Sequence, residues 1–93
     1  MNKYEVLYIL DSKVEGAQKD ALIEKYSALV TENGGEVESV DKWGDKKFAY
    51  PIDYKTEGYY VLMNFTADPA FPQELERQMR IADEVIRYMV IKK

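Results

Sequence analysis

The chain has 93 residues, 46% of them hydrophobic, and its 17 acidic residues outnumber its 13 lysines and arginines to give a net charge of −4. This length predicts a single domain spanning residues 1–93. Neither cysteine nor histidine occurs, which excludes a disulfide framework, a thiolate metal site and the commonest general base. No apolar run is long enough for a signal peptide or a membrane span, so we expect a cytoplasmic protein.

The first third of the chain predicts a strand followed by a helix. From Lys3 to Leu10 apolar residues occur at both alternate sets of positions, which is typical of a central strand with material on both faces. From Ala17 to about Asn33 the apolar residues fall on one helical stripe. Gly34 and Gly35 follow, and we expect them to end this helix in a left-handed cap.

The next segment, Glu36 to Trp43, predicts a half-exposed outer strand that continues through residues 47–52. Val37 and Val40 would point to opposite faces of a strand with strict alternation. This mismatch predicts a bulge or bend near Gly44.

A polar connection, Asp53 to Glu57, separates this strand from a second apolar run, and the pair predicts a β-hairpin. Pro51 cannot donate a backbone hydrogen bond, so the first arm should lie at an edge or end there. The second arm, Tyr59 to Phe65, is largely apolar on both faces and should lie inside a sheet.

The last third predicts a second helix and a final strand. Asp68 is a suitable N-cap and Pro69 a suitable first residue for a helix of about three turns. Asp83 interrupts the helical pattern, and Val85 to Lys92 alternates as a strand.

The predicted order is therefore strand, helix, strand, strand, helix, strand. Two right-handed crossovers of this kind give an α+β ferredoxin-like sandwich, in which two helices cover one face of a four-stranded antiparallel sheet. The other face stays uncovered, and such a patch normally marks a partner site. The alternation does not determine which set of side chains faces outward. The candidates for the uncovered face are Leu7, Ile9, Tyr60, Leu62, Met89 and Ile91.

No combination of residues predicts catalysis. The chain lacks a glycine-rich phosphate loop, a nucleophile–base pair and a cluster of metal ligands, so we expect no enzyme, cofactor, metal ion or small-molecule substrate. Small phosphatases of the same fold hold phosphate with an arginine near the first strand. The first arginine here is Arg77, so this chain lacks that group.

Signals for nucleic-acid binding are mixed. A net acidic charge argues against it, although bases outnumber acids from Pro69 onward. Residues 58–65 partly resemble the third-strand motif of RNA-recognition domains, in which sheet aromatics stack on bases. Glu57 and Tyr60 depart from that motif at its basic and its small position. Packing in a core or on a protein partner is therefore the favoured interpretation for these tyrosines.

Individual cations also have two interpretations. Lys46 and Lys47 near the hairpin fit edge protection and phosphate contact about equally well. Arg80 has the ordinary role of complementing a helix dipole. Arg87 interrupts an apolar strand, and a guanidinium there requires a carboxylate or a phosphate nearby.

The order and spacing of several short motifs resemble the ribosomal protein S6 family of the bacterial small subunit over essentially the whole chain. The motifs are Tyr4-Glu5-Val6, Gly34-Gly35-Glu36-Val37, Trp43-Gly44, Lys47-Phe48-Ala49-Tyr50-Pro51-Ile52, Gly58-Tyr59-Tyr60, Arg80-Ile81-Ala82-Asp83, Ile86-Arg87 and Met89-Val90-Ile91-Lys92. That family has the ferredoxin-like fold which the periodicity predicts.

The resemblance implies a structural, non-enzymatic role: binding to the central domain of 16S ribosomal RNA together with ribosomal protein S18, as a heterodimer. It also implies sites. The basic positions that match the family, and are candidates for RNA contact, are Lys3, Lys46, Lys47, Arg80, Arg87 and Lys92. Both members of the family's usual Arg-Arg pair are lysines here, which lack the bidentate guanidinium fork. The candidates for contact with the protein partner are Tyr50, Tyr60 and Leu62.

A second hypothesis remains open beside this one. A small ligand-sensing or regulatory domain of the same fold would self-associate through the uncovered sheet face. It would form a homodimer and bind no RNA.

Overall fold

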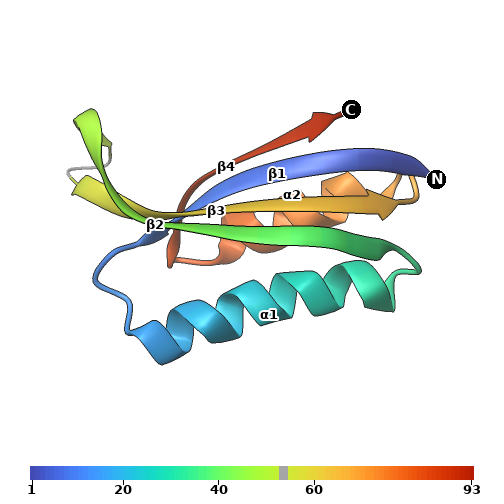
Figure 1. Cartoon of the computed structure of the whole chain (residues 1–93), viewed down its shortest axis with the longest axis horizontal. Helices are drawn as coiled ribbons and strands as arrows, with labels where there is room; N and C mark the ends of the chain where they lie inside the picture. Colours follow the sequence, from blue (N-terminus) through green and yellow to red (C-terminus); the bar gives the residue numbers. More distant parts are fainter. Residues whose placement is uncertain (53–54) are drawn as a thin grey trace.

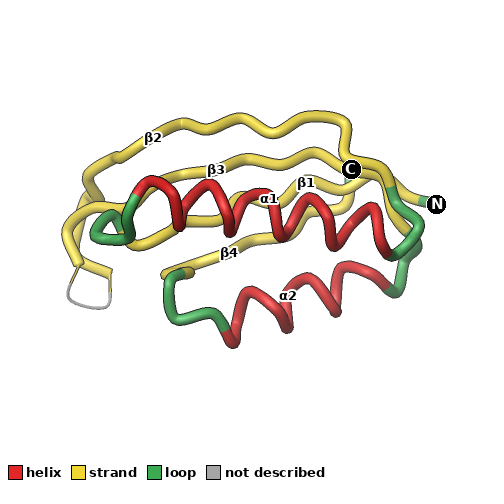
Figure 2. Tube along the Cα trace, turned by 90° about the horizontal axis from the view of Figure 1, so that it is seen from below, coloured by secondary structure: helices red, strands yellow, loops and turns green. Residues whose placement is uncertain are grey.

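Four strands and two helices alternate in the predicted order in the computed structural model, which describes residues 1–52 and 55–93, and side chains outside residues 48–56. The elements are β1 (Asn2–Asp11), α1 (Gly16–Glu32), β2 (Glu36–Ile52), β3 (Lys55–Ala67), α2 (Phe71–Ile81) and β4 (Val85–Lys92). The strands form one antiparallel sheet in the order β2-β3-β1-β4, and both helices cover the same face of it (Figures 1 and 2). The predicted ferredoxin-like sandwich is confirmed.

The core lies between this sheet and the helices. Every second residue of β1 and β3 is buried there, because successive side chains of a strand point to opposite faces. Each helix adds one stripe of buried side chains. The main core residues are Tyr4, Val6, Tyr8, Leu10, Ile23, Tyr26, Val30, Val61, Met63, Phe65, Phe71, Leu75 and Met79.

Aromatic rings fill the centre of this core. The ring of Phe65 stacks on Tyr4 with centroids 5.6 Å apart and meets Phe71 edge-on at 5.8 Å. Tyr8 and Tyr26 meet edge-on at 5.5 Å, and neither hydroxyl forms a hydrogen bond within the described part of the chain. Burial raises the pKa of the Tyr8 hydroxyl, and burial and the charge of Glu84 raise the pKa of Tyr26 to about 12. Both tyrosines are therefore neutral core residues.

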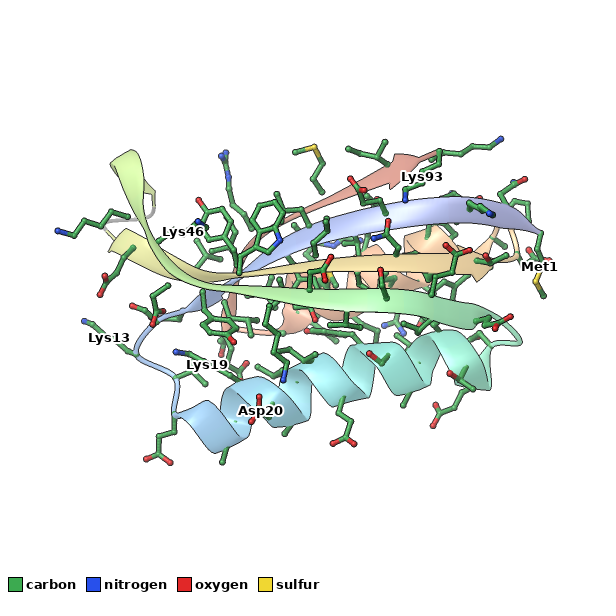
Figure 3. The ribbon with its side chains drawn as sticks, in the orientation of Figure 1. Met1, Lys13, Lys19, Asp20, Lys46 and Lys93 are labelled. Carbon is green, nitrogen blue, oxygen red and sulfur yellow. The ribbon has the colours of Figure 1, made fainter. Side chains whose placement is uncertain are left out.

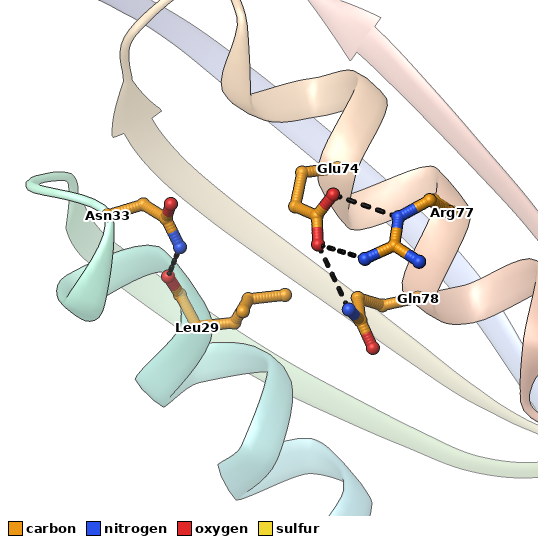
Figure 4. Close-up of polar contacts among 5 residues, drawn as sticks. All are labelled: Leu29, Asn33, Glu74, Arg77 and Gln78. Carbon is orange, nitrogen blue, oxygen red and sulfur yellow. Dashed lines mark hydrogen bonds and ion pairs between the residues drawn. The ribbon is translucent and has the colours of Figure 1, made fainter.

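The two glycines after α1 have different roles. Gly34 has φ +82°, the left-handed conformation predicted for a helix cap, and the Asn33 side chain donates a hydrogen bond of 2.8 Å to the Leu29 carbonyl (Figure 4). Gly35 is required because of close packing instead. A Cβ atom there would lie 2.5 Å from the Thr66 carbonyl oxygen and 2.9 Å from Cγ1 of Val30.

We expect Gly35→Ala to lower the free energy of unfolding by about 1–3 kcal/mol, because the backbone of β3 must move away from the added methyl group. Gly16→Ala is the control, since a Cβ at Gly16 has no atom within 4 Å. Urea unfolding followed by circular dichroism measures both. Equal midpoints for the two variants would contradict the close approach of Gly35 to β3.

The start of the second helix differs from the prediction. The helix begins at Phe71 after Ala70, so neither Asp68 nor Pro69 has its predicted position. The Asp68 carboxylate instead accepts a 2.9 Å hydrogen bond from the Ala70 N–H, in a turn that precedes the helix. Pro72 is the proline of the first turn, where its missing N–H has no carbonyl to bond.

Strand β2 contains the predicted bulge. Its register against β3 shifts between Lys42 and Gly44, and Gly44 has φ +86°. A second shift, between Val37 and Ser39, brings Val37 and Val40 to the same face, where both pack against the core. The hairpin is also longer than predicted, because β3 begins within the expected connection.

Candidate protein and RNA interface

The sheet face away from the helices, called the open face below, carries the six apolar residues that the sequence proposed. In the strand register, Ile9 lies between Tyr60 and Arg87, and Leu7 lies between Leu62 and Met89. Ile91 lies beside Glu5 on the same face. Paired residues of neighbouring strands share a face, so these positions form adjacent rows across β3, β1 and β4.

The centre of the open face is a shallow apolar depression of about 490 Å³. It is lined by Leu7, Ile9, Tyr60, Arg87, Tyr88 and Met89. Ile9 is only 7% exposed, whereas Met89 and Ile91 on the edge strand β4 are 54% and 46% exposed. The open face is thus an apolar floor with an exposed rim, a form that suits a protein partner.

Trp43 extends this surface and was not among the predicted site residues. Its ring lies parallel to that of Tyr60, with centroids 6.3 Å apart and planes 11° apart, and 45% of the residue is exposed. The sequence feature that could have identified Trp43 as a surface residue of this face is the predicted bulge at Gly44, which brings Trp43 opposite β3. Leu62 lies on the same face. The third predicted partner contact, the side chain of Tyr50, lies outside the described residues.

The six predicted basic residues do not form one cluster. Lys46, Arg87 and Lys3 lie on the open face, since they are paired with Gly58, Ile9 and Thr66. Lys46 lies at the hairpin end of the sheet, whereas the chain termini lie at the opposite end (Figure 3).

The other three point elsewhere. Lys47 is paired with Glu57 and Lys92 with Tyr4, so both are on the helix side of the sheet. Arg80 is exposed in the last turn of α2, as expected for a cation that complements the helix dipole.

Most of these cations have no acidic partner among the side chains that the structure describes. Among the described side chains, none forms an ion pair with Lys46, Lys47, Arg80, Arg87 or Lys92. Lys3 lies 3.9 Å from Glu38. The carboxylate or phosphate that the sequence required near Arg87 is thus not supplied by a carboxylate in the described part of the chain.

Arg77, in contrast, has an acidic partner in its own helix. Its guanidinium donates hydrogen bonds of 2.7 and 3.0 Å to the two carboxylate oxygens of Glu74, which also accepts one from Gln78 (Figure 4). The Arg77 and Gln78 hydrogen bonds hold the pKa of the Glu74 carboxyl at about 2. This pair therefore stays ionised at neutral pH, and Arg77 is bound to its own helix.

Neither a membrane-spanning helix nor a cluster of metal ligands occurs in residues 1–52 and 55–93. No helix of this part is long and apolar enough to cross a membrane. No group of three or more acidic side chains there is placed to hold a metal ion.

Comparison with known proteins identifies the family. The family described as "Ribosomal protein S6" matches residues 3–92 of the chain. The chain belongs to the ribosomal protein S6 family. It is 49% identical to small ribosomal subunit protein bS6 of Thermoanaerobacter pseudethanolicus over 92 residues, which cover 99% of this chain and 97% of that protein. The corresponding protein of Alkaliphilus metalliredigens is 48% identical over the same shares of both chains.

A solved structure agrees with this assignment. The crystal structure of 30S ribosomal protein S6 from Thermotoga maritima matches with a TM-score of 0.94 and 30% sequence identity, covering 99% of this chain and 87% of that one. As a ribosomal protein S6, the chain is a structural, non-enzymatic component of the small ribosomal subunit and works in the cytoplasm. The predicted family, and the predicted absence of enzymatic activity, are confirmed.

Proposed function

We propose that this ribosomal protein S6 binds the central domain of 16S ribosomal RNA as a heterodimer with ribosomal protein S18. The observation that carries the proposal is the open face, where Trp43 stacked on Tyr60 adjoins the apolar depression around Ile9. The two helices cover only the opposite face of the sheet. Burying exposed apolar surface against a partner is favourable at about 25 cal/mol per Å².

Three features suit a protein rather than RNA at the centre of this face. The floor is formed by aliphatic side chains, with Leu7 and Ile9 between Tyr60 and Met89. Trp43 and Tyr60 already stack on each other, so one face of each ring is taken. Aromatic and methionine side chains are enriched at protein interfaces. We therefore assign Tyr60 and Leu62 to contact with S18 and add Trp43 to them.

The RNA contacts are assigned to the cations around this surface. Each lysine or arginine that neutralises a phosphate releases counterions, which strengthens binding most at low salt. Lys46 and Arg87 are on the open face toward the hairpin, and neither has an acidic partner among the described side chains. The remaining candidates are Lys3, Lys47, Arg80 and Lys92.

The acidic net charge of this chain opposes RNA binding by the chain alone. The net charge of −4 opposes approach to a phosphate backbone, and the six candidate cations are spread over several faces. A basic partner on the open face would extend the few cations around it into a continuous positive surface. The heterodimer therefore accounts for RNA binding better than this chain alone does.

The experiment mixes the protein with a 16S central-domain fragment, with and without purified S18, across a potassium chloride series. We expect tight, salt-sensitive binding only when S18 is present. Absence of binding in every mixture, together with a stable homodimer in solution, would overturn the proposal in favour of a self-associating regulatory domain.

Arg87→Ala should weaken RNA binding by the heterodimer and lower the slope of log affinity against log salt by about one, because one phosphate contact is lost. Arg77→Ala is the matched control, since it removes the same charge from a side chain that already forms an ion pair with Glu74. Filter binding measures the affinity, and urea unfolding checks that both variants remain folded. An unchanged affinity and salt slope for Arg87→Ala would remove Arg87 from the RNA contacts.

A further inference from the structure

Lys19 in the first turn of α1 is the most deeply buried cation of the ion pairs described, with its side chain only 12% exposed. Its ammonium donates a 3.2 Å hydrogen bond to the Ser12 carbonyl and lies 3.8 Å from a carboxylate oxygen of Asp45. It also lies 4.8 Å from the centre of the Tyr59 ring (Figure 3 shows Lys19 between α1 and the sheet). The one ammonium thus joins the β1–α1 loop, β2 and β3.

The contact of Lys19 with Asp45 depends on the bulge in β2. Lys42 is opposite Val61 and therefore faces the helices, and Asp45, three residues later, is opposite Tyr59 on the same side. In a regular strand, residues three apart point to opposite faces. The extra residue before Gly44 reverses this alternation, so the Asp45 carboxylate reaches Lys19.

The same reversal decides the direction of the two lysines that follow. In the bulged register Lys46 is on the open face and Lys47 is on the helix side. A slip of one residue would exchange them, because a strand repeats every two residues. The slip would also turn Asp45 outward and take a carboxylate away from a nearly buried ammonium, which is unfavourable.

We propose that Lys19 is a positioning residue that selects the bulged register of β2 and thereby directs Lys46, rather than Lys47, to the open face. Trp43 is positioned by the same bulge, since it occupies the extra position opposite Tyr60. Lys19 itself is assigned neither to the RNA contacts nor to the S18 contacts. The effect on RNA binding rests on the proposed function, whereas the effect on the register does not.

The loop that holds Lys19 is closed by its own hydrogen bonds. Asp11 organises the loop that carries Ser12: its carboxylate accepts a 3.0 Å hydrogen bond from the Lys13 N–H, and its carbonyl accepts a 3.1 Å bond from Val14. These bonds hold the Ser12 carbonyl toward the first turns of α1. Lys19 can act as a fixed reference against which β2 sets its register.

The first test needs no RNA. Lys19→Met keeps most of the side-chain volume and removes the charge, Lys19→Arg keeps the charge, and Lys25→Met is the matched control on the exposed side of α1. Backbone NMR contacts between Asp45 and Tyr59 report the bulged register, and the fluorescence of Trp43 reports its stacking because it is the only tryptophan. We expect Lys19→Met alone to weaken these contacts and shift the Trp43 emission to longer wavelength, and Lys19→Arg to restore both.

The second test compares the two lysines in the heterodimer with S18 and the 16S fragment. In the parent protein, Lys46→Ala should weaken binding about fivefold more than Lys47→Ala. In the Lys19→Met background this difference should disappear or reverse, a change that a general loss of stability would not produce.

The outcomes separate the two proposals. If Lys19→Met leaves the Asp45–Tyr59 contacts and the Trp43 emission unchanged, the inference is wrong whatever the RNA does. If these signals change but the parent protein binds no RNA, Lys19 sets the register and the proposed function fails instead. An unaltered difference between Lys46→Ala and Lys47→Ala in the Lys19→Met background would also overturn the positioning role.

Discussion

Phe65→Ala is expected to lower the free energy of unfolding by about 3–5 kcal/mol. The Phe65 ring is fully buried on the helix side of β3 and contacts Tyr4 and Phe71, so its loss leaves a cavity between the sheet and α2. A domain of this size has a total stability of about 5–15 kcal/mol. The variant should therefore be only marginally folded at room temperature.

Urea unfolding monitored by circular dichroism measures this loss, with Leu62→Ala as the control on the same strand. Leu62 is on the open face and only half-buried, so its truncation should cost about 1 kcal/mol. Similar losses for the two variants would mean that the open face contributes as much to stability as the core does.

Tyr60→Glu is expected to weaken the complex with S18 by about 30-fold or more, the effect of a central interface residue worth roughly 2 kcal/mol. Tyr60 supports Trp43 and lines the apolar depression, so a carboxylate there would be desolvated by the partner, which is unfavourable. The isolated protein should lose little stability, because the open face is solvated before S18 binds.

Titration calorimetry with purified S18 measures this effect, and Tyr60→Phe is the matched control that keeps the ring and removes only the hydroxyl. We expect Tyr60→Phe to bind within a few-fold of the parent protein. Normal binding of Tyr60→Glu would place the S18 contact elsewhere on the molecule. Unfolding of the isolated variant would show that Tyr60 is needed for the fold as well.

Much of the fold could be predicted because the local signals agree. Strand alternation and the helical stripe of α1 each lie within a single element, and the two glycines follow α1 directly, with Gly34 in the predicted left-handed conformation. The predicted start of α2 was wrong because two nearby patterns compete. Asp68-Pro69 and the later Pro72 both suit the first turn of a helix, and packing of Phe71 into the core favours the later start.

The candidate site was only partly predictable. The apolar residues of the open face could be named as a group, but their face could not be chosen, since both sets of alternate positions in β1 and β3 are apolar. The cations were identified through the family resemblance, which carries no information on their directions. Lys46 and Lys47 are adjacent in sequence, yet the bulge places them on opposite sides of the sheet.

The order of the elements, the sandwich architecture and the ribosomal protein S6 family could be predicted from the amino-acid sequence, because they follow from local periodicity and short motifs. The open face of the sheet, and the cations that have partners within the described chain, became clear from the folded structure alone. It also brought Lys19 to Asp45 and stacked Trp43 on Tyr60. The physical reason is that strand register is set between segments distant in sequence, where one inserted residue turns every following side chain to the other face.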